Sequence, residues 1–314
     1  MGRYLLFRPS TRFPGDHFNT GQNAIWLDLN WVNEPTSKES IRSLATELRD
    51  HQIRYVSVYT SYLKANDRFN PTYAYAADFT RSLKSEDRGV IVLAWIGLPL
   101  ESSTFPSGNG NVDLSNPRTR QYIASFCADR ITQDGFDGVH LDPEPVPNGD
   151  EDLLTLLDDV RQTIPKSSLL SLATRHIQPI MSDTPVPVLD QLLWQSRYYS
   201  EVADRVDQVA LMTYDSHLPL GTLYRTWVRF QVIALTDALK DTNRQVLIGV
   251  PTSEERTPSH WPGAENMETG LSGTIDGLND KASVDSVVTG VAIYPEWETG
   301  QAEWQEYQSL WLRR

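Results

Sequence analysis

The sequence predicts a single α/β domain, a (β/α)8 barrel, on three observations. Eight short apolar runs recur along the 314 residues, and amphipathic stretches separate them. The runs are continuously hydrophobic, which is typical of parallel strands that are covered on both faces. Links that enter a run are short and polar, whereas several links that leave a run are long, as they are on the face of such barrels that carries chemistry.

The elements follow in order along the chain. We expect strands at 24–30, 55–60, 90–96, 136–142, 169–175, 208–214, 245–250 and 290–295. The clearest helix starts are a capping box of Thr36 with Glu39 and an N-cap at Asn116 followed by Pro117. Further helices are expected at 150–164, 222–240 and 302–314, and a less regular one at 72–86. The long links are 97–115, 176–188 and 251–270.

Chain length alone favours two domains of about 150 residues, but barrels of this kind often exceed 250 residues as one unit. We therefore assign 1–21 to an N-terminal extension and 22–314 to the barrel. An open, doubly wound sheet is the alternative architecture. No glycine-rich phosphate-binding motif follows any of the apolar runs, so a nucleotide site has no support.

Composition excludes several classes of partner. The chain has 28 basic and 41 acidic residues, a net charge of −13, which disfavours nucleic acid and anionic membrane surfaces. No apolar run is long enough to span a membrane. The single cysteine, Cys127, excludes an intramolecular disulfide and favours a buried core residue. We favour an extracellular or cell-surface location, with a leader or anchor removed, and keep the cytoplasm as the alternative.

The densest polar cluster lies at the end of the fourth predicted strand. His140, Asp142 and Glu144 are two residues apart, so on a strand they share one face, the interior of a barrel. Three ionisable groups at one barrel end are expensive to bury for structure alone. Neighbouring carboxylates separate their pKa values, so one of them can stay protonated and act as a general acid. The alternative is a solvated turn bounded by prolines.

Other polar and aromatic residues also fall at predicted strand ends. Tyr214, Asp215 and His217 follow the sixth strand, and Trp297 follows the eighth. Each residue alone is explained by packing or capping, and their shared placement is the informative fact. The remaining residues of this set are Asp28, Asn30, Trp31, Tyr59, Trp95, Arg175 and His176.

Three of these motifs together resemble glycoside hydrolase family 18, the chitinase-like barrels. The run Asp137–Glu144 resembles that family's DGxDxDxE signature, Met212–Asp215 resembles its Met-x-Tyr-Asp motif, and Trp297 matches the tryptophan after its last strand. The resemblance spans about 22–312. His140 replaces the middle aspartate of the signature, and the family's Ser-x-Gly-Gly motif is absent. We identify no insertion domain within 252–289.

The resemblance implies a retaining, substrate-assisted hydrolase that acts on oligo- or polysaccharides bearing a 2-acetamido group. By analogy, Glu144 is the general acid and base, and Asp142 accepts from the acetamido N–H. Tyr214 donates to the acetamido oxygen, Asp215 binds sugar, and Trp297 stacks under it. No cofactor and no metal are implied. The other residues expected at the substrate are Asp28, Tyr59, Trp95, Met212 and Arg175.

His140 and the reaction class leave alternatives open. His140 either donates to Asp142 and favours its ionised form, or fills the barrel with its own hydrogen bonds satisfied. Asp137 is expected to be a structural acceptor. The chain could instead be an inactive carbohydrate-binding barrel, or a metal hydrolase that uses His140, Asp142 and Glu144 with His176 and His217 as further ligands.

Overall fold

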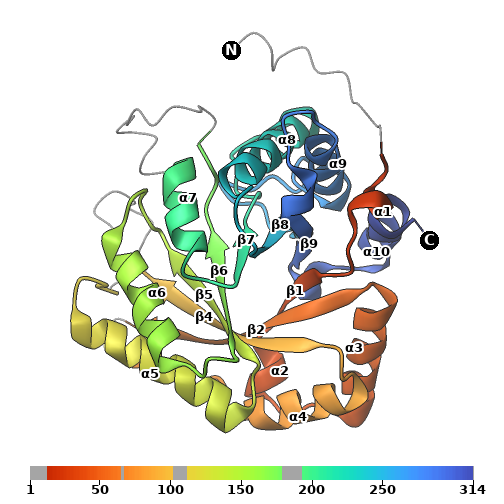
Figure 1. The fold of residues 1–314 in the computed structure, drawn as a ribbon. Coiled ribbons are helices and arrows are strands. Elements are labelled where there is room, and N and C mark those ends of the chain that lie inside the picture. The colour runs from red at the N-terminus through yellow and green to blue at the C-terminus, as the bar shows by residue number, and fades with distance from the viewer. Residues whose placement is uncertain (1–12, 65–66, 102–111, 179–192, 314) are drawn as a thin grey trace.

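Eight parallel strands close into a barrel, and helices surround it (Figure 1). The computed structural model describes residues 13–64, 67–101, 112–178 and 193–313. In order around the barrel, the strands are β1 (Asn23–Leu27), β2 (Ile53–Lys64), β4 (Ile91–Pro99), β5 (Gly138–Glu144), β6 (Leu169–Thr174), β7 (Gln208–Leu211), β8 (Gln245–Pro251) and β9 (Val288–Tyr294). Pairing of β1 with both β9 and β2 closes the ring, which confirms the predicted (β/α)8 barrel.

Each of the eight predicted apolar runs contains a strand, but β1, β2, β4 and β7 end three or four residues away from the predicted bounds. The differences in β2 and β7 affect the mouth of the barrel most. Strand β2 continues to Lys64 and pairs with the short antiparallel strand β3 (Arg68–Phe69). Strand β7 ends at Leu211, so the Met212–Asp215 motif lies in the loop at the mouth of the barrel. The short β7 thus places polar residues over the barrel interior without extending the sheet.

The helices occupy most of the expected stretches. Their bounds are α1 (Gly15–Phe18), α2 (Asn30–Asn33), α3 (Lys38–Asp50), α4 (Ala76–Glu86), α5 (Pro117–Asp134), α6 (Glu151–Thr163), α7 (Ser196–Ala203), α8 (Gly221–Ala238), α9 (Met267–Leu278) and α10 (Gln301–Tyr307), with short helical turns at Asp285–Val287, Glu296–Glu298 and Gln308–Leu312. Asn116 caps α5 as expected. The predicted capping box of Thr36 and Glu39 is wrong, because Ser37 caps α3 by accepting from the Ser40 backbone N–H.

The strands bury both faces, and this explains their unbroken hydrophobicity. One core lies between the strands and the surrounding helices. A second core fills the barrel interior and consists of Ala24, Trp26, Tyr55, Trp95, Ala210, Leu247 and Ala292. Large aromatic rings on some strands face alanines on others, so the interior is packed with side chains and is not a channel.

A chain of hydrogen bonds crosses the interior among these apolar side chains. It runs from Trp26 through His140, Ser171, Gln208 and Gln245 to Tyr55. Gln208 and Gln245 are the first residues of β7 and β8, and the chain therefore lies near the N-terminal ends of those strands. It satisfies polar groups that would otherwise be buried without partners.

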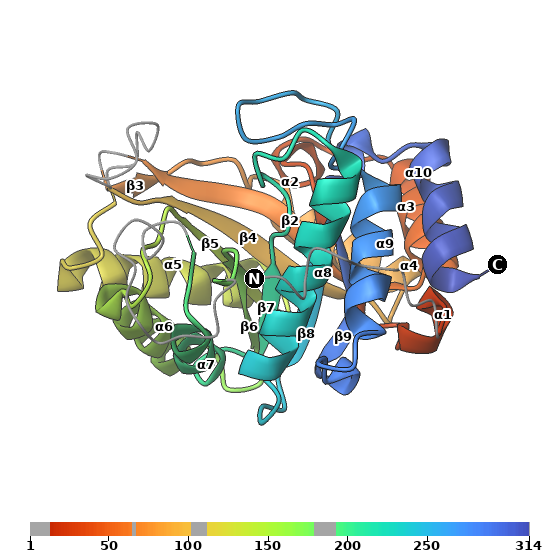
Figure 2. The same ribbon diagram turned by 90° about the horizontal axis from the view of Figure 1, so that it is seen from above.

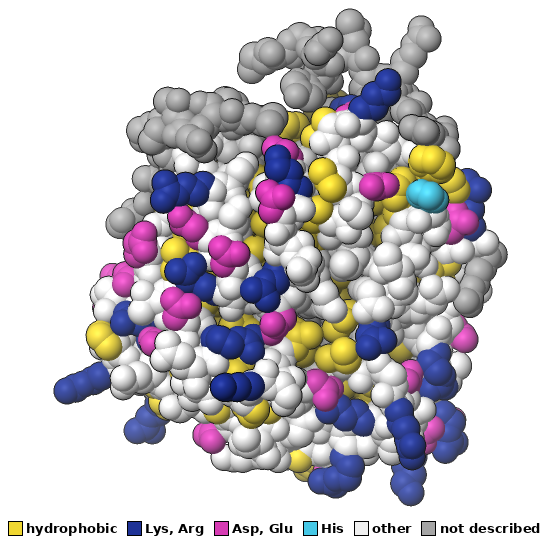
Figure 3. All heavy atoms as spheres, viewed as in Figure 1, with side chains coloured by type: hydrophobic (Ala, Val, Ile, Leu, Met, Phe, Trp, Pro, Cys, Tyr) yellow, Lys and Arg dark blue, Asp and Glu magenta, His cyan; other side chains and the backbone are white. Residues whose placement is uncertain are grey.

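The outside of the barrel carries the first described residues and most of the charged side chains. Of the predicted N-terminal extension, residues 13–21 lie against the barrel, where the Phe13 N–H donates to Asn279 Oδ1, and residues 1–12 lie outside the described residues. Basic and acidic side chains are intermixed over the face in Figure 3. None of the helices in the described part of the chain has the length and hydrophobicity that crossing a membrane requires.

Candidate active site

The mouth of the barrel gathers two acidic residues of β5 and the loop that follows β7. Asp142 and Glu144 end β5 on one face of the strand, and Tyr214 and Asp215 approach them from the β7 loop. A pocket of about 240 Å³ opens here, and Arg175 lies on its wall. The pocket is lined by Glu144, Arg175, His176, Leu193, Met212, Tyr214, Asp215, Ser216, His217 and Trp227.

Asp142 lies below the pocket with one oxygen bonded and one open. Its Oδ2 accepts from Trp95 Nε1 at 3.0 Å, whereas its buried Oδ1 has no hydrogen-bond partner among the described residues. Burial raises the pKa of Asp142, and the Trp95 hydrogen bond opposes this rise. A buried acceptor without a donor is costly, so Oδ1 is ready to accept from a ligand.

Glu144 occupies the rim above Asp142 and stays accessible to solvent. Removal of water from around its carboxyl raises the pKa of Glu144, the charges of Asp142 and Asp215 raise it further, and Arg175 lowers it. The Glu144 side chain is exposed, so solvent reduces the effect of burial on its pKa. The two neighbouring carboxylates raise the pKa independently of burial. Because Asp142 and Glu144 interact, they lose their protons as a pair, with Glu144 the weaker acid.

Aromatic rings form one side of the mouth. Tyr214 stacks on Tyr294 with ring centroids 5.0 Å apart, and Tyr294 meets Trp297 edge-on at 5.9 Å. Trp297 is 44% exposed, enough to offer a ring face to a ligand. Tyr59 and Trp95 pack against each other at 4.7 Å beside Asp142. Tyr294 is absent from the sequence-based candidates, although its place at the end of β9 could have indicated it.

His140 does not donate to Asp142, and the first of the two hypotheses for this residue is wrong. Its Nε2 accepts from Trp26 Nε1 at 3.0 Å, and its Nδ1 lies 2.8 Å from Ser171 Oγ. Since the indole N–H can only donate, Nε2 is unprotonated and Nδ1 donates to Ser171. Burial lowers the pKa of His140 to about 3, so the ring is neutral and belongs to the interior chain of hydrogen bonds.

The first strand contributes less to the mouth than expected. Asp28 Oδ1 accepts from the Asn30 backbone N–H at 2.8 Å and so forms the turn after β1. Trp31 packs on Phe79 and donates to Glu296, and both contacts lie outside the pocket. The structure therefore brings together the expected residues of the other strands, whereas Asp28 forms the turn after β1 and its expected contact with substrate stays a prediction.

Two further expectations concern Asp137 and a metal. Asp137 is the expected structural acceptor: its carboxylate binds Lys84 Nζ at 2.7 Å and the Val92 backbone N–H at 2.9 Å. Within the described ranges, no three His, Cys, Asp or Glu side chains are placed to hold a metal ion. His140 is not available as a ligand of the proposed metal site, because both of its ring nitrogens already form hydrogen bonds.

Sequence comparison decides the family. The family model for glycosyl hydrolases family 18 matches residues 30–309. The chain belongs to this family. As a family 18 protein it is a glycosidase, and its closed barrel agrees with that class. No curated protein matches the sequence of this family 18 hydrolase.

Solved structures share the fold of this hydrolase at low identity. The chitinase RmChi1 of Rhizomucor miehei has a TM-score of 0.63 at 12% identity, over 93% of this chain and 100% of that one. An N-acetylglucosaminidase of Paenibacillus barengoltzii has a TM-score of 0.59 at 14% identity, over 93% of this chain and 99% of that one. A class V chitinase of Nicotiana tobaccum, solved with NAG4, has a TM-score of 0.60 at 12% identity, over 92% of this chain and 98% of that one.

Proposed function

We propose that this family 18 hydrolase cleaves β-linked glycans that contain N-acetylglucosamine, with retention of configuration and with Glu144 as general acid and base. The observation that carries the proposal is the open Oδ1 of Asp142, which is buried without a donor beneath the solvent-accessible Glu144. An acetamido N–H supplies the donor that this oxygen lacks. The named activity of the Paenibacillus neighbour and the NAG4 bound by the Nicotiana neighbour agree with this substrate class.

The first step uses the raised pKa of Glu144. Protonated Glu144 gives its proton to the glycosidic oxygen while the substrate's acetamido oxygen attacks the anomeric carbon, and the bond to the leaving group breaks. The resulting cyclic oxazolinium carries a positive charge, which the ionised Asp142 stabilises through the acetamido nitrogen. The substrate thereby supplies the nucleophile that a second carboxylate supplies in ordinary retaining glycosidases.

The second step reverses the role of Glu144. Its carboxylate now removes a proton from water, and the water oxygen attacks the anomeric carbon. The oxazolinium ring opens, and the acetamido group is restored. Glu144 ends the cycle protonated, as it began. The pKa shifts favour this division of roles, because Glu144 holds its proton more strongly than Asp142 does.

The other residues at the mouth orient the sugar. In this proposal the Tyr214 hydroxyl donates to the acetamido oxygen, Asp215 binds a sugar hydroxyl or the acetamido group, and Trp297 stacks under the ring. Tyr59 and Trp95 lie on β2 and β4 beside Asp142, and Trp95 donates a hydrogen bond to one oxygen of Asp142. Met212 and Arg175 line the pocket wall, and Arg175 also moderates the pKa of Glu144.

The substitution Glu144→Gln tests the proposal. It keeps the shape of the side chain but removes the proton donor, so kcat on a fluorogenic N-acetylglucosamine oligomer should fall by a factor of about 10² to 10⁴. Binding of an unlabelled oligomer, followed by tryptophan fluorescence, should persist. Glu39→Gln on α3 is the control and should keep full activity. Equal activity of Glu144→Gln and the unsubstituted protein would remove Glu144 from the mechanism.

A second candidate is a barrel that binds such glycans without cleaving them. The observation in its favour is His140, which stands where the family has an aspartate and is held neutral by Trp26 and Ser171. The same experiment separates the two functions. A binding protein would take up the oligomer with equal affinity before and after Glu144→Gln and would release no product in either form.

A further inference from the structure

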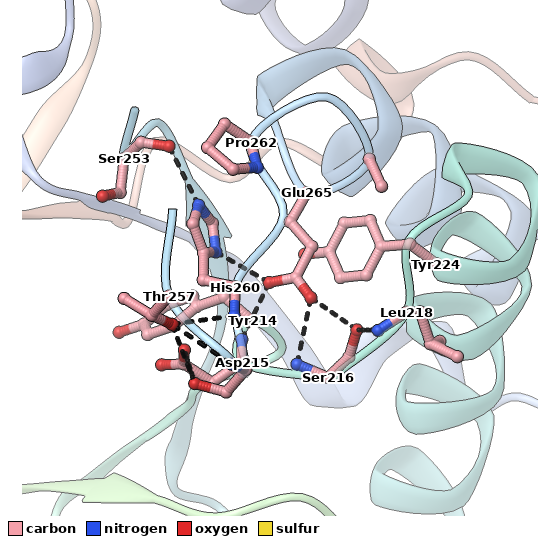
Figure 4. Close-up of polar contacts among 12 residues, drawn as sticks. Tyr214, Asp215, Ser216, Leu218, Tyr224, Ser253, Thr257, His260, Pro262 and Glu265 are labelled. Atoms are coloured by element: carbon pink, nitrogen blue, oxygen red, sulfur yellow. Dashed lines mark hydrogen bonds and ion pairs between the residues drawn. The ribbon is translucent and has the colours of Figure 1, made fainter. Parts of the chain in front are cut away.

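A buried carboxylate holds the backbone of the β7 loop (Figure 4). Glu265 is fully buried, and its Oε2 accepts from the Asp215 backbone N–H at 2.8 Å. Its Oε1 accepts from the Ser216 backbone N–H at 3.0 Å and from Ser216 Oγ at 2.6 Å. One side chain from the β8–α9 loop therefore holds two successive backbone groups next to Tyr214.

His260 provides the counter-charge for Glu265. Its Nδ1 lies 2.8 Å from Glu265 Oε2, and its Nε2 lies 2.9 Å from the carbonyl oxygen of Ser253. A carbonyl oxygen only accepts, and Oε2 already accepts from Asp215, so both ring nitrogens face acceptors and carry protons. Burial lowers the pKa of His260, but the hydrogen bonds to Glu265 and Ser253 and the charges of Glu265 and Asp215 outweigh it, and the pKa is raised. Glu265 and His260 thus form a buried ion pair.

The backbone of the β7 loop needs such support. Asp215 and His217 have φ values of 58° and 60°, in the left-handed region that residues other than glycine occupy at a cost of about 1 kcal/mol or more. Successive N–H groups in such a turn converge on one side and form a site for an anion. The Glu265 carboxylate fills that site, and its hydrogen bonds offset the cost of the left-handed conformation at Asp215.

The same β8–α9 loop also holds the Asp215 side chain. Ser259 Oγ donates to Asp215 Oδ1 at 2.8 Å, so the backbone and the carboxylate of Asp215 are both fixed by one segment. Glu265 directly precedes Asn266, whose side chain caps α9 in a reciprocal capping box. Helix α9 lies beside α8 (Figure 2). Gly273 and Gly277 of α9 lie against Val228 and Val232 of α8, where a Cβ on either glycine would clash. Glu265 is therefore anchored to a rigid pair of helices.

We propose that Glu265, paired with His260, is a positioning residue that sets the geometry of Tyr214 and Asp215 at the sugar without touching the substrate. This role rests on the proposed hydrolysis, in which Tyr214 and Asp215 orient the acetamido group. The geometry that supports it is the continuous path from the α9 N-terminus through Glu265 to the Asp215 backbone, with Tyr214 adjacent in the chain.

The test compares Glu265→Gln and His260→Gln with the unsubstituted full chain. An amide at residue 265 offers one acceptor and one donor where two acceptors are needed, so kcat on the N-acetylglucosamine oligomer should fall at least about 10-fold, with KM changed by less than about 3-fold. His260→Gln retains one of the two donors and should lose less. Hydrogen exchange of the Asp215 and Ser216 amides should be faster in both variants. All rates are measured well below the thermal midpoint, on protein shown to be folded by circular dichroism.

Asp276→Asn is the matched control. Asp276 is a buried α9 carboxylate that pairs with Arg225 of α8, so its loss should lower the thermal midpoint but leave kcat and the exchange of both loop amides unchanged. A Glu265→Gln variant with full kcat per folded molecule overturns the positioning role, because a purely structural residue would change stability alone. If the unsubstituted chain cleaves no such oligomer, the proposed function fails. The exchange rates then decide alone, and unchanged amide protection in Glu265→Gln also overturns the role.

Discussion

Trp95 favours the ionised form of Asp142. Its indole N–H donates to Oδ2 of Asp142 and opposes the rise in pKa that burial causes. Asp142 must be ionised to stabilise the positive oxazolinium, so the acid side of the pH profile should report its pKa. The pair therefore links one hydrogen bond to a measurable pH dependence.

Substituting Trp95→Phe should move the acid limb of kcat/KM to higher pH. A hydrogen bond worth about 1 kcal/mol corresponds to a pKa change of about 0.7, and its loss raises the pKa of Asp142. The measurement is kcat/KM between pH 3 and 9. Trp304→Phe is the control, because the buried Trp304 indole nitrogen has no hydrogen-bond partner among the described residues. An acid limb that stays in place would show that Trp95 does not set the ionisation of Asp142.

At this scale the sequence predicted what lies on one strand and missed what crosses between loops. Alternation along β5 was sufficient to place His140, Asp142 and Glu144 on one face. It could not show that Trp26, which is distant in the sequence, donates a hydrogen bond to His140, so that His140 does not bond to Asp142. Glu265 had no local signal either, because its partners Asp215 and Ser216 are about fifty residues earlier and the contact depends on how α9 packs.

At the scale of the elements, β5 owes its position to a glycine. A Cβ on Gly138 would lie 2.0 Å from the carbonyl oxygen of Leu169, a backbone atom that cannot move without displacing β6. Gly138 is also the first residue of the strand that carries Asp142 and Glu144. The close approach of β5 and β6 is thus a condition for the position of both carboxylates.

The variant Gly138→Ala should be destabilised and less active. Overpacking of this kind costs about 1–3 kcal/mol, and the shift of β5 should also lower kcat in the protein that remains folded. Urea unfolding gives the first quantity and initial rates the second. Gly263→Ala is the control, since a Cβ there meets nothing within 4 Å, and its free energy of unfolding should stay within about 0.5 kcal/mol. A fully stable and active Gly138→Ala would show that β5 can move away from β6 without loss of stability or activity, which contradicts the prediction.

The elements also show where local propensity fails. Helix α9 was not among the predicted helices, because Gly270, Gly273 and Gly277 make its sequence a poor helix former. In the fold Gly273 and Gly277 allow α9 to lie against Val228 and Val232 of α8, and Gly270 allows it to lie against β8. The packing of this helix outweighs its low propensity. The eight strands were predictable because burial on both faces leaves a continuous apolar run in each of them.

For the molecule as a whole, the neutral His140 in the barrel interior ties stability to pH. Its pKa in the folded protein is about 3, below the ordinary 6.5, so between these values the unfolded chain binds a proton that the folded chain excludes. The contribution of His140 to stability is complete above pH 6.5 and is lost as the pH falls toward 3.

Replacing His140→Gln should remove this pH dependence. Glutamine offers one acceptor for Trp26 and one donor for Ser171 but does not titrate. The difference in free energy of unfolding between the two proteins should be constant above about pH 7 and then change by up to about 1.4 kcal/mol per pH unit in acid, with the unsubstituted protein losing more. Urea titrations from pH 8 to 4 measure it. Parallel stability curves would contradict a buried neutral histidine.

Closure of the sheet also affects how the molecule behaves when it is concentrated. Each of the eight barrel strands has neighbours on both sides, so among the described residues the one sheet edge left open belongs to the two-residue strand β3. Its Arg68 is exposed and charged, and its Phe69 is buried. Such a short, charged edge gives another chain almost no backbone on which to add a strand. The native fold therefore carries its own protection against edge-to-edge aggregation, and this protection depends on the barrel remaining closed.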